Sequence, residues 1–114
     1  MQLVTQKQPV TRAQLSDYSQ KMFGGLVKAV LDIEQEIMFV DAEMHADEEM
    51  QLLENGSKQD NLWGINLYPE ETGDDFIEFD SMINVRPRQN NRSRSVESEE
   101  LQEKIRSIVL KLVV

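Results

Sequence analysis

Hydrophobic and polar residues alternate along two neighbouring stretches of the chain, and this pattern predicts β-strands. Residues 26–34 and 37–45 each carry an apolar side chain at about every second position, with a polar turn between them. We expect an antiparallel hairpin here, because the β-branched and aromatic residues of both stretches favour strands. One long helix over residues 27–45 is the alternative, since Glu, Gln, Ala and Met are good helix formers.

A second hairpin is predicted over residues 62–68 and 76–86, on either side of an acidic turn. Both runs alternate in the same way, and Pro87 ends the second run because proline cannot donate to a strand ladder. The two hairpins together predict a four-stranded antiparallel sheet. Residues 2–5 are a further candidate for a short strand, outside these hairpins.

Three helices are predicted, over residues 11–23, 47–54 and 98–113. The first begins with a capping box formed by Thr11 and Gln14. The second has acidic residues in its first turn, where they suit the positive end of the helix dipole. The third begins after a serine cap and carries one apolar stripe, made of Leu101, Ile105, Ile108, Val109 and Leu112.

These elements predict a single α+β domain over residues 1–114, with the two terminal helices packed on one face of the sheet. The opposite face is expected to mix charged with apolar side chains, the apolar ones being Val30, Ile37, Phe39, Tyr68, Phe76 and Met82. Six apolar side chains on one face are enough for an interface. We therefore expect a homodimer that forms through this face.

The composition narrows the class of protein. Of the 114 residues, 39% are hydrophobic and 29% are charged, as expected of one soluble globular domain. No apolar stretch approaches the ~20 residues that span a bilayer, and the N-terminus does not resemble a signal peptide, so we expect a cytoplasmic protein without membrane contact. The chain has no cysteine and one histidine, which excludes thiol catalysis, Cys-based metal sites and multi-histidine sites within one chain.

The net charge of −9 is distributed unevenly along the chain. Residues 32–80 hold sixteen acidic residues and one basic residue, whereas residues 81–96 hold four arginines and no acidic residue. A chain this acidic repels phosphates at long range, so we expect no nucleic-acid partner. The arginines either neutralise part of the acidic segment, within a chain or across a dimer, or bind an external anion.

The predicted strands carry residues that suit acid–base or metal chemistry. Glu78 and Asp80 lie two positions apart on one strand and therefore point to the same side. Asp32, Glu43 and His45 join them if the two hairpins pair in a suitable register. The four carboxylates are candidate ligands of Mg²⁺, Mn²⁺ or Ca²⁺, and Glu78, Asp80 and His45 are candidates for acid–base catalysis. The alternative is a solvated acidic face with a structural histidine, and the sequence predicts no cofactor.

The arginine-rich segment is the candidate binding site for a small anion. Arg86, Arg92 and Arg94, together with Asn84 and Asn91, supply many hydrogen-bond donors before the last helix. Guanidinium groups and helix N-termini both suit phosphates and carboxylates. No aromatic residue alternates with these arginines, which argues against stacking on single-stranded nucleic acid.

Three runs of sequence carry a resemblance to a known family. HADEE at residues 45–49, LWGINLYPE at 62–70 and FDSMIN at 79–84 resemble a small bacterial family that is described only as a domain of unknown function. The resemblance covers the chain from about residue 9 to residue 112. It implies a small bacterial cytosolic protein, and it transfers no catalytic role to any residue.

The sequence leads to three hypotheses for function, and it leaves open whether the protein is an enzyme. The first is a small, non-enzymatic interaction module that acts as a homodimer or binds another protein. The second is a small enzyme or ligand-binding protein, which uses carboxylates and arginines to hold a metal ion or an anionic small molecule. The third is RNA binding through residues 86–94, the one locally basic segment of an acidic chain.

Overall fold

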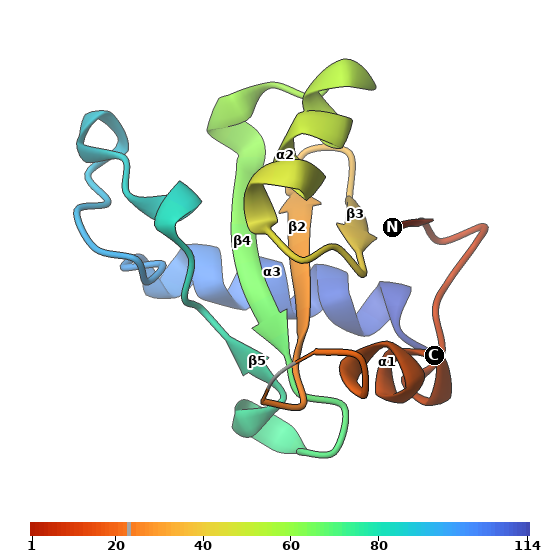
Figure 1. Cartoon of the computed structure of the whole chain (residues 1–114). Helices are drawn as coiled ribbons and strands as arrows, with labels where there is room; N and C mark the ends of the chain where they lie inside the picture. Colours follow the sequence, from red (N-terminus) through yellow and green to blue (C-terminus); the bar gives the residue numbers. More distant parts are fainter. Residues whose placement is uncertain (23) are drawn as a thin grey trace.

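Five strands form one antiparallel sheet in the order β1-β3-β2-β4-β5 (Figure 1). This computed structural model describes residues 1–22 and 24–114, and the number of strands refers to these residues. The strands are β1 (Gln2–Val4), β2 (Val27–Asp32), β3 (Ile37–Val40), β4 (Leu62–Leu67) and β5 (Ile77–Glu78). The predicted α+β class and the antiparallel sheet are confirmed, but the prediction of four strands is wrong. The additional strand is β1, which pairs with β3 because Leu3 and Val4 bury their side chains in separate apolar clusters.

The first predicted hairpin is confirmed, and the alternative of one long helix is wrong. β2 and β3 pair in antiparallel register, with Val30 opposite Phe39. β3 ends at Val40, earlier than predicted, because Asp41 has a left-handed backbone conformation (φ 68°) that an extended strand cannot continue. His45 therefore lies at the start of a helix and not at the end of a strand.

The described residues contain three α-helices, α1 (Arg12–Ser19), α2 (His45–Glu54) and α3 (Glu99–Leu112). The capping box is confirmed, because the Gln14 N–H donates to Thr11 Oγ1 over 3.0 Å and the Thr11 N–H donates to Gln14 Oε1 over 2.9 Å. α1 ends at Ser19, and residue 23, the predicted end, lies outside the described residues. Among the described residues, no helix is long and apolar enough to cross a membrane.

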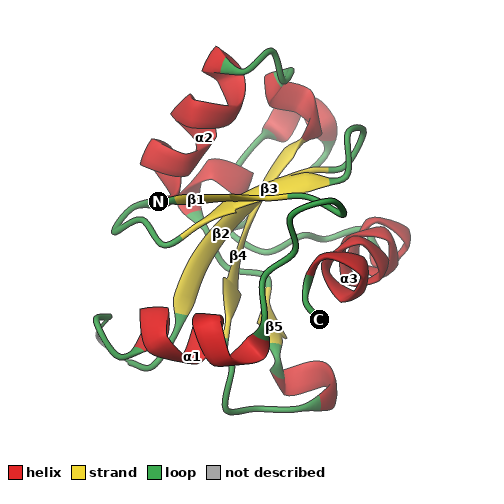
Figure 2. Ribbon diagram, turned by 90° about the vertical axis from the view of Figure 1, so that its right-hand side faces the viewer, coloured by secondary structure: helices red, strands yellow, loops and turns green. Residues whose placement is uncertain are grey.

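The two terminal helices pack on the same side of the sheet, as predicted (Figure 2). Leu15 of α1 and Ile105, Ile108, Val109 and Leu112 of α3 belong to one buried cluster. The sheet contributes alternate residues to this cluster, including Val27, Ala29 and Leu31 of β2. The apolar stripe on α3 and the alternation along β2 thus meet in the main core.

The opposite face of the sheet is covered by α2 and is not open, so the exposed apolar face that we predicted does not exist (Figure 2). Leu52 of α2 packs with Val30, Phe39 and Leu62, all of which are buried. Phe76 is buried in the main core, on the other side. Of the six predicted apolar residues only Met82 is largely exposed. A homodimer therefore needs a different surface from the one the sequence predicted.

The second predicted hairpin is confirmed only in its first part. β4 pairs with β5 through two residues, Ile77 and Glu78, although residues 76–86 were predicted to form one strand. Beyond Glu78 the chain turns at Met82–Asn84 and passes beside β4. The side chain of Asn84 then takes the place of a strand backbone, because its Nδ2 donates to Gly64 O over 2.9 Å and its Oδ1 accepts from Gly64 N–H over 2.8 Å.

Candidate functional site

A row of polar residues crosses the sheet on the side that α2 covers. Lys28 of β2 lies opposite Asn66 of β4, which lies opposite Glu78 of β5. Asn66 Nδ2 donates to Glu78 Oε1 over 2.9 Å and to the carbonyl of Asp80 over 3.1 Å. The Tyr68 hydroxyl donates to the same Glu78 oxygen over 3.1 Å. Asn66 therefore contacts both residues predicted to act together, Glu78 through its carboxylate and Asp80 through its backbone carbonyl.

His45 joins this row from the first turn of α2. Its Nε2 lies 2.8 Å from the carbonyl oxygen of Ile65 and must carry a proton there, because a carbonyl only accepts. Burial lowers the pKa of His45, with the neighbouring Lys28 charge acting in the same direction, against the Ile65 hydrogen bond and the Asp80 charge, which raise it. The imidazole is therefore neutral at pH 7, and its other nitrogen is an acceptor.

A small cavity opens between the first turn of α2 and the segment that follows β5. It has a volume of about 220 Å³, and its lining includes Lys28, His45, Ser81 and Arg94. Among the described residues that line the cavity, two are cationic and none is a carboxylate. Met44, whose side chain is 56% exposed, and Met82 add apolar surface at its edges.

The groups around this cavity have defined partners. Lys28 Nζ donates to the carbonyl of Glu43 over 2.8 Å, and Arg94 Nε donates to Asp80 Oδ1 over 2.6 Å. The residue before α2 is Met44, which has no side chain able to cap the helix. Within the described residues, the N–H groups of the first turn therefore have no side-chain acceptor, and they carry the positive end of the helix dipole.

The predicted set of metal ligands is divided between two places. Asp32 is buried at the β2–β3 turn, where it accepts from Glu34 N–H, Gln35 N–H and the Ser57 hydroxyl. Burial alone would raise the pKa of Asp32, but these hydrogen bonds outweigh burial and hold the pKa below its usual value. The side chain of Glu43 is exposed. In residues 1–22 and 24–114 no group of three or more His, Cys, Asp or Glu side chains is placed to hold a metal ion.

Three of the predicted anion-binding residues, Arg86, Asn84 and Asn91, instead form hydrogen bonds with backbone groups of the chain. Arg86 lies 4.2 Å from the centroid of the Trp63 ring and donates to the carbonyls of Gln59, Leu62 and Ile83. Burial lowers the pKa of Arg86, against the charge of Glu49, which raises it. Asn84 is fully buried against β4 and Asn91 is 4% exposed. Asn91 Nδ2 donates to three carbonyls, those of Asn84, Ser93 and Ser95.

The other two predicted arginines are more exposed. Arg94 reaches the cavity beside α2, as described above. The backbone N–H of Arg92 donates to Glu97 Oε2 over 2.8 Å, and its side chain is exposed. The structure therefore brings together His45, Glu78, Asp80 and Arg94, and it places Asp32, Arg86 and Asn91 elsewhere.

Sequence reasoning did not single out three residues of this site, namely Lys28, Asn66 and Ser81. The alternation along the strands already placed Lys28 and Asn66 on one face with Glu78. Their exact pairing depends on β2 lying beside β4, which the order of the elements along the chain does not determine. The alternation along the strands therefore indicated the correct face of the sheet, but the contact between Lys28 and Asn66 could be predicted only with the strand order.

Comparison with known proteins gives a family and no activity. A family model described as "Protein of unknown function (DUF5674)" matches residues 3–112. No curated protein and no solved structure matches the chain significantly. A function must therefore be argued from the site.

Proposed function

The chain belongs to this family of unknown function, and from that premise we propose that it is a non-enzymatic binding module. In this proposal, the cavity at the N-terminus of α2 binds an anionic group of a partner protein. The observation that carries the proposal is the cavity lined by Lys28, His45 and Arg94 beside an uncapped helix start. Cationic side chains and helix N-termini both stabilise a carboxylate or a phosphate.

The cavity suits one anionic group better than a whole small molecule. Its volume of about 220 Å³ lies below the ~300–1,000 Å³ of typical small-molecule sites. Met44 and Met82 stand at its edges with largely exposed side chains. Methionine adapts its shape to different apolar partners. These features support an acidic or phosphorylated side chain as the occupant, with the methionines packing against the residues around it.

Binding is favoured over catalysis by the partners of the candidate catalytic residues. Glu78 accepts from Asn66 and Tyr68, and Asp80 forms an ion pair with Arg94. A general base must be able to reach the proton that it removes, whereas these two carboxylates are already hydrogen-bonded within the chain. His45 is best suited to bind the anion, because its second nitrogen becomes a donor when the ring is protonated.

The proposal is tested with inorganic phosphate as the probe, in NMR titrations of the labelled protein. We expect phosphate to move the amide signals of His45 and Ala46, with affinity rising as the pH falls and His45 is protonated. Lys28→Gln should weaken binding about fivefold, the equivalent of ~1 kcal/mol for one nearby charge. Arg88→Gln is the matched control, because Arg88 is exposed, outside the cavity, and carries the same charge. Equal binding by both variants, or no movement of these amide signals, would contradict the proposal.

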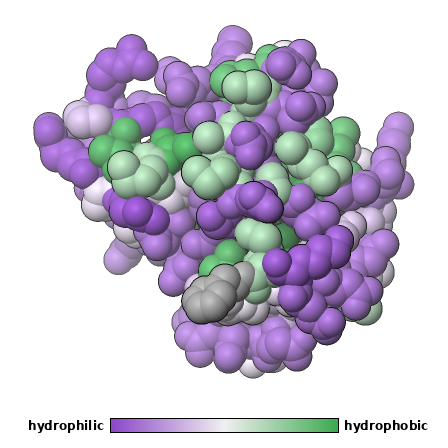
Figure 3. Space-filling view, viewed as in Figure 1, coloured by the Kyte–Doolittle hydropathy of each residue, from purple (hydrophilic) through white to green (hydrophobic). Residues whose placement is uncertain are grey.

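A homodimer is a second candidate, favoured by the exposed apolar side chains on and beside α2. Figure 3 shows apolar patches over α2 and the 82–85 segment, separated by polar side chains. The exposed apolar residues of these two segments are Met44, Met50, Leu53, Met82 and Val85. We expect light scattering to give twice the chain mass of 13.2 kDa, and Met44→Glu with Met82→Glu to return it to the monomer value. A monomer at high concentration would rule this candidate out.

A further inference from the structure

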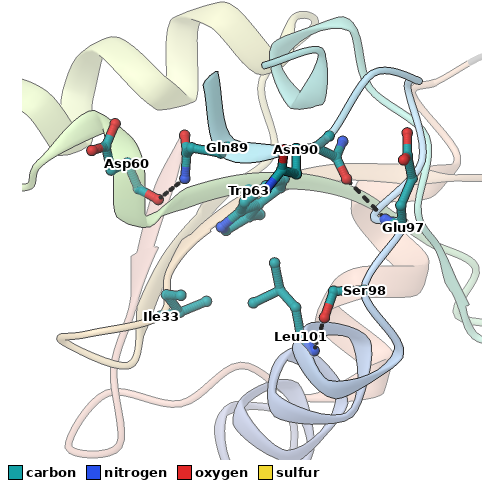
Figure 4. A pocket seen from close by; sticks show the side chains of 9 residues that line it. Ile33, Asp60, Trp63, Gln89, Asn90, Glu97, Ser98 and Leu101 are labelled. Carbon is teal, nitrogen blue, oxygen red and sulfur yellow. Dashed lines mark hydrogen bonds between the residues drawn. The ribbon is translucent and has the colours of Figure 1, made fainter. Parts of the chain in front are cut away.

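A second, larger cleft lies at the other end of β4, away from the cavity beside α2. It has a volume of about 520 Å³, within the ~300–1,000 Å³ range of small-molecule sites. Its walls come from the β2–β3 turn, the start of β4, the turn at residues 87–89 and the N-terminal part of α3 (Figure 4). Four segments that are distant in sequence therefore meet around one space.

The indole of Trp63 has an unused hydrogen-bond donor in this cleft. Trp63 lines the cleft and is 3% exposed, and its Nε1 is buried without a partner in the described part of the chain. Figure 4 shows the indole over the space between Ile33 and Leu101. A buried N–H without an acceptor costs free energy, which a ligand oxygen placed in the cleft would recover.

The walls that hold the indole are fixed by hydrogen bonds. Arg86 stacks 4.2 Å from the centroid of the Trp63 ring and is itself held by backbone carbonyls. Gln89 Nε2 donates to the carbonyl of Asp60 over 3.0 Å, so that the turn at residues 87–89 is joined to the start of β4. Asn91 Oδ1 accepts from Glu97 N–H over 2.9 Å, which fixes the segment before α3. The polar walls of the cleft are therefore held in place by hydrogen bonds within the chain.

The charge of the lining limits the kind of ligand. Asp60 and Glu97 lie on opposite sides of the opening (Figure 4), and the part of the chain that the structure describes contributes no lysine or arginine to the lining. Hydrogen bonds from the Ser93 side chain, and then from the Arg92 and Ser93 backbone, lower the pKa of Glu97, which is therefore ionised. The two negative charges would repel an anion here, but they would not repel a neutral molecule and would attract a cation. The two cavities thus have opposite preferences.

We infer that this cleft binds a small, neutral or cationic organic molecule, whose carbonyl oxygen accepts from Trp63 Nε1–H and whose apolar part packs between Ile33 and Leu101. Because Nε1 is buried, this binding requires side chains beside the indole to move, and Ile33 and Leu101 in the lining are only partly buried. This inference does not depend on the anion site beside α2, because the two cavities share no lining residue.

Trp63 is the one tryptophan of the chain, so the indole N–H gives one NMR signal that reports directly on the cleft. The probes are benzamide, benzoate and benzamidinium, which share a ring and differ in charge and in the presence of an oxygen acceptor. At millimolar concentration we expect benzamide to move the indole signal downfield. Benzoate should bind about fivefold more weakly because of the two carboxylates, and benzamidinium should bind without the downfield shift.

Two variants connect the result to the cleft. Asp60→Asn should improve benzoate binding, whereas Asp75→Asn, which changes an exposed residue outside the cleft, should leave it unchanged. Ile33→Phe should fill the space and abolish the benzamide shift, with Met50→Phe on the exposed side of α2 as the control. Circular dichroism establishes that each variant is folded. The inference is overturned if benzamide leaves the indole signal in place, or if Ile33→Phe and Met50→Phe respond alike.

Discussion

Gly64 of β4 lies so close to Ser81 that no larger residue fits, because a Cβ at position 64 would stand 2.6 Å from Ser81 Cβ. The same Cβ would come within 3.1 Å of the Ile83 side chain. Glycine weakens the interior of a strand, so its presence there marks a close approach of another segment. Here that segment is residues 81–84, which pass beside the middle of β4 and of which residues 81–83 line the cavity beside α2.

Gly64→Ala should therefore destabilise the protein by about 3 kcal/mol, since neither backbone can move without breaking the Asn84 hydrogen bonds. Chemical denaturation measures the loss. Ser81→Gly removes the atoms that collide, so the double variant should recover part of the stability lost by Gly64→Ala. Additive losses in the double variant would show that the contact with Ser81 is not the cause.

Asn84→Asp tests the side chain that continues the sheet. Aspartate keeps the acceptor for Gly64 N–H but loses the donor to the carbonyls of Gly64 and Arg94. We expect a loss of about 3 kcal/mol at pH 7. The buried carboxyl favours its neutral form, so the loss should grow as the pH rises above ~4 and shrink below it. Asn90→Asp is the control, because Asn90 is exposed.

Glu48 of α2 is fully buried, and burial raises its pKa to about 10, although a hydrogen bond from Ala42 N–H opposes this. The folded state then holds a proton that the unfolded chain releases near its ordinary pKa of 4.5. Stability must therefore fall as the pH rises from about 4.5 towards 10. Glu48→Gln has no such proton to hold, so it should raise stability, on the order of 3 kcal/mol at pH 7 and less at pH 5. Melting temperatures measured across pH test this, with the exposed Glu43→Gln as the control. A gain that does not change with pH would contradict the buried, protonated carboxyl.

Asp32 should show the opposite dependence on pH, because its folded pKa lies below the unfolded value of 3.8. Its stabilisation is present above that value and is lost as the pH falls through the folded pKa. Asp32→Asn should cost about 2 kcal/mol at pH 7, since it weakens the bonds from Glu34, Gln35 and Ser57. The two proteins should become equally stable in acid. Glu34→Gln, at an exposed position in the same turn, is the control.

The elements that sequence reasoning predicted well are those that depend on neighbours in the chain. The capping box of Thr11 and Gln14 and the apolar stripe on α3 need only residues within a few positions of one another. The hairpin of β2 and β3 likewise depends on two adjacent runs and the short turn between them. In each case the residues that decide the structure lie close together in sequence.

The predictions that were wrong depended on distant residues. Residues 79–86 alternate like a strand, but Asn84 and Ser81 instead meet β4 at a glycine about twenty positions earlier. The face that we expected to be open is covered, because Leu52 of α2 packs on Val30 and Phe39. No local pattern shows where a helix that follows a hairpin will lie.

The candidate site divides in the same way. The sequence by itself determined its chemical groups, an acidic middle segment beside an arginine-rich one, because composition and charge need no coordinates. Only the tertiary structure decided which groups keep a free donor or acceptor. Because β2 lies beside β4, Lys28 lies in one row with Asn66 and Glu78. The side chains of Arg86 and Asn91, in contrast, donate to backbone carbonyls in the turns near Trp63. The physical reason is that a buried polar group forms hydrogen bonds with the groups that packing places beside it, and packing joins segments that are remote in sequence.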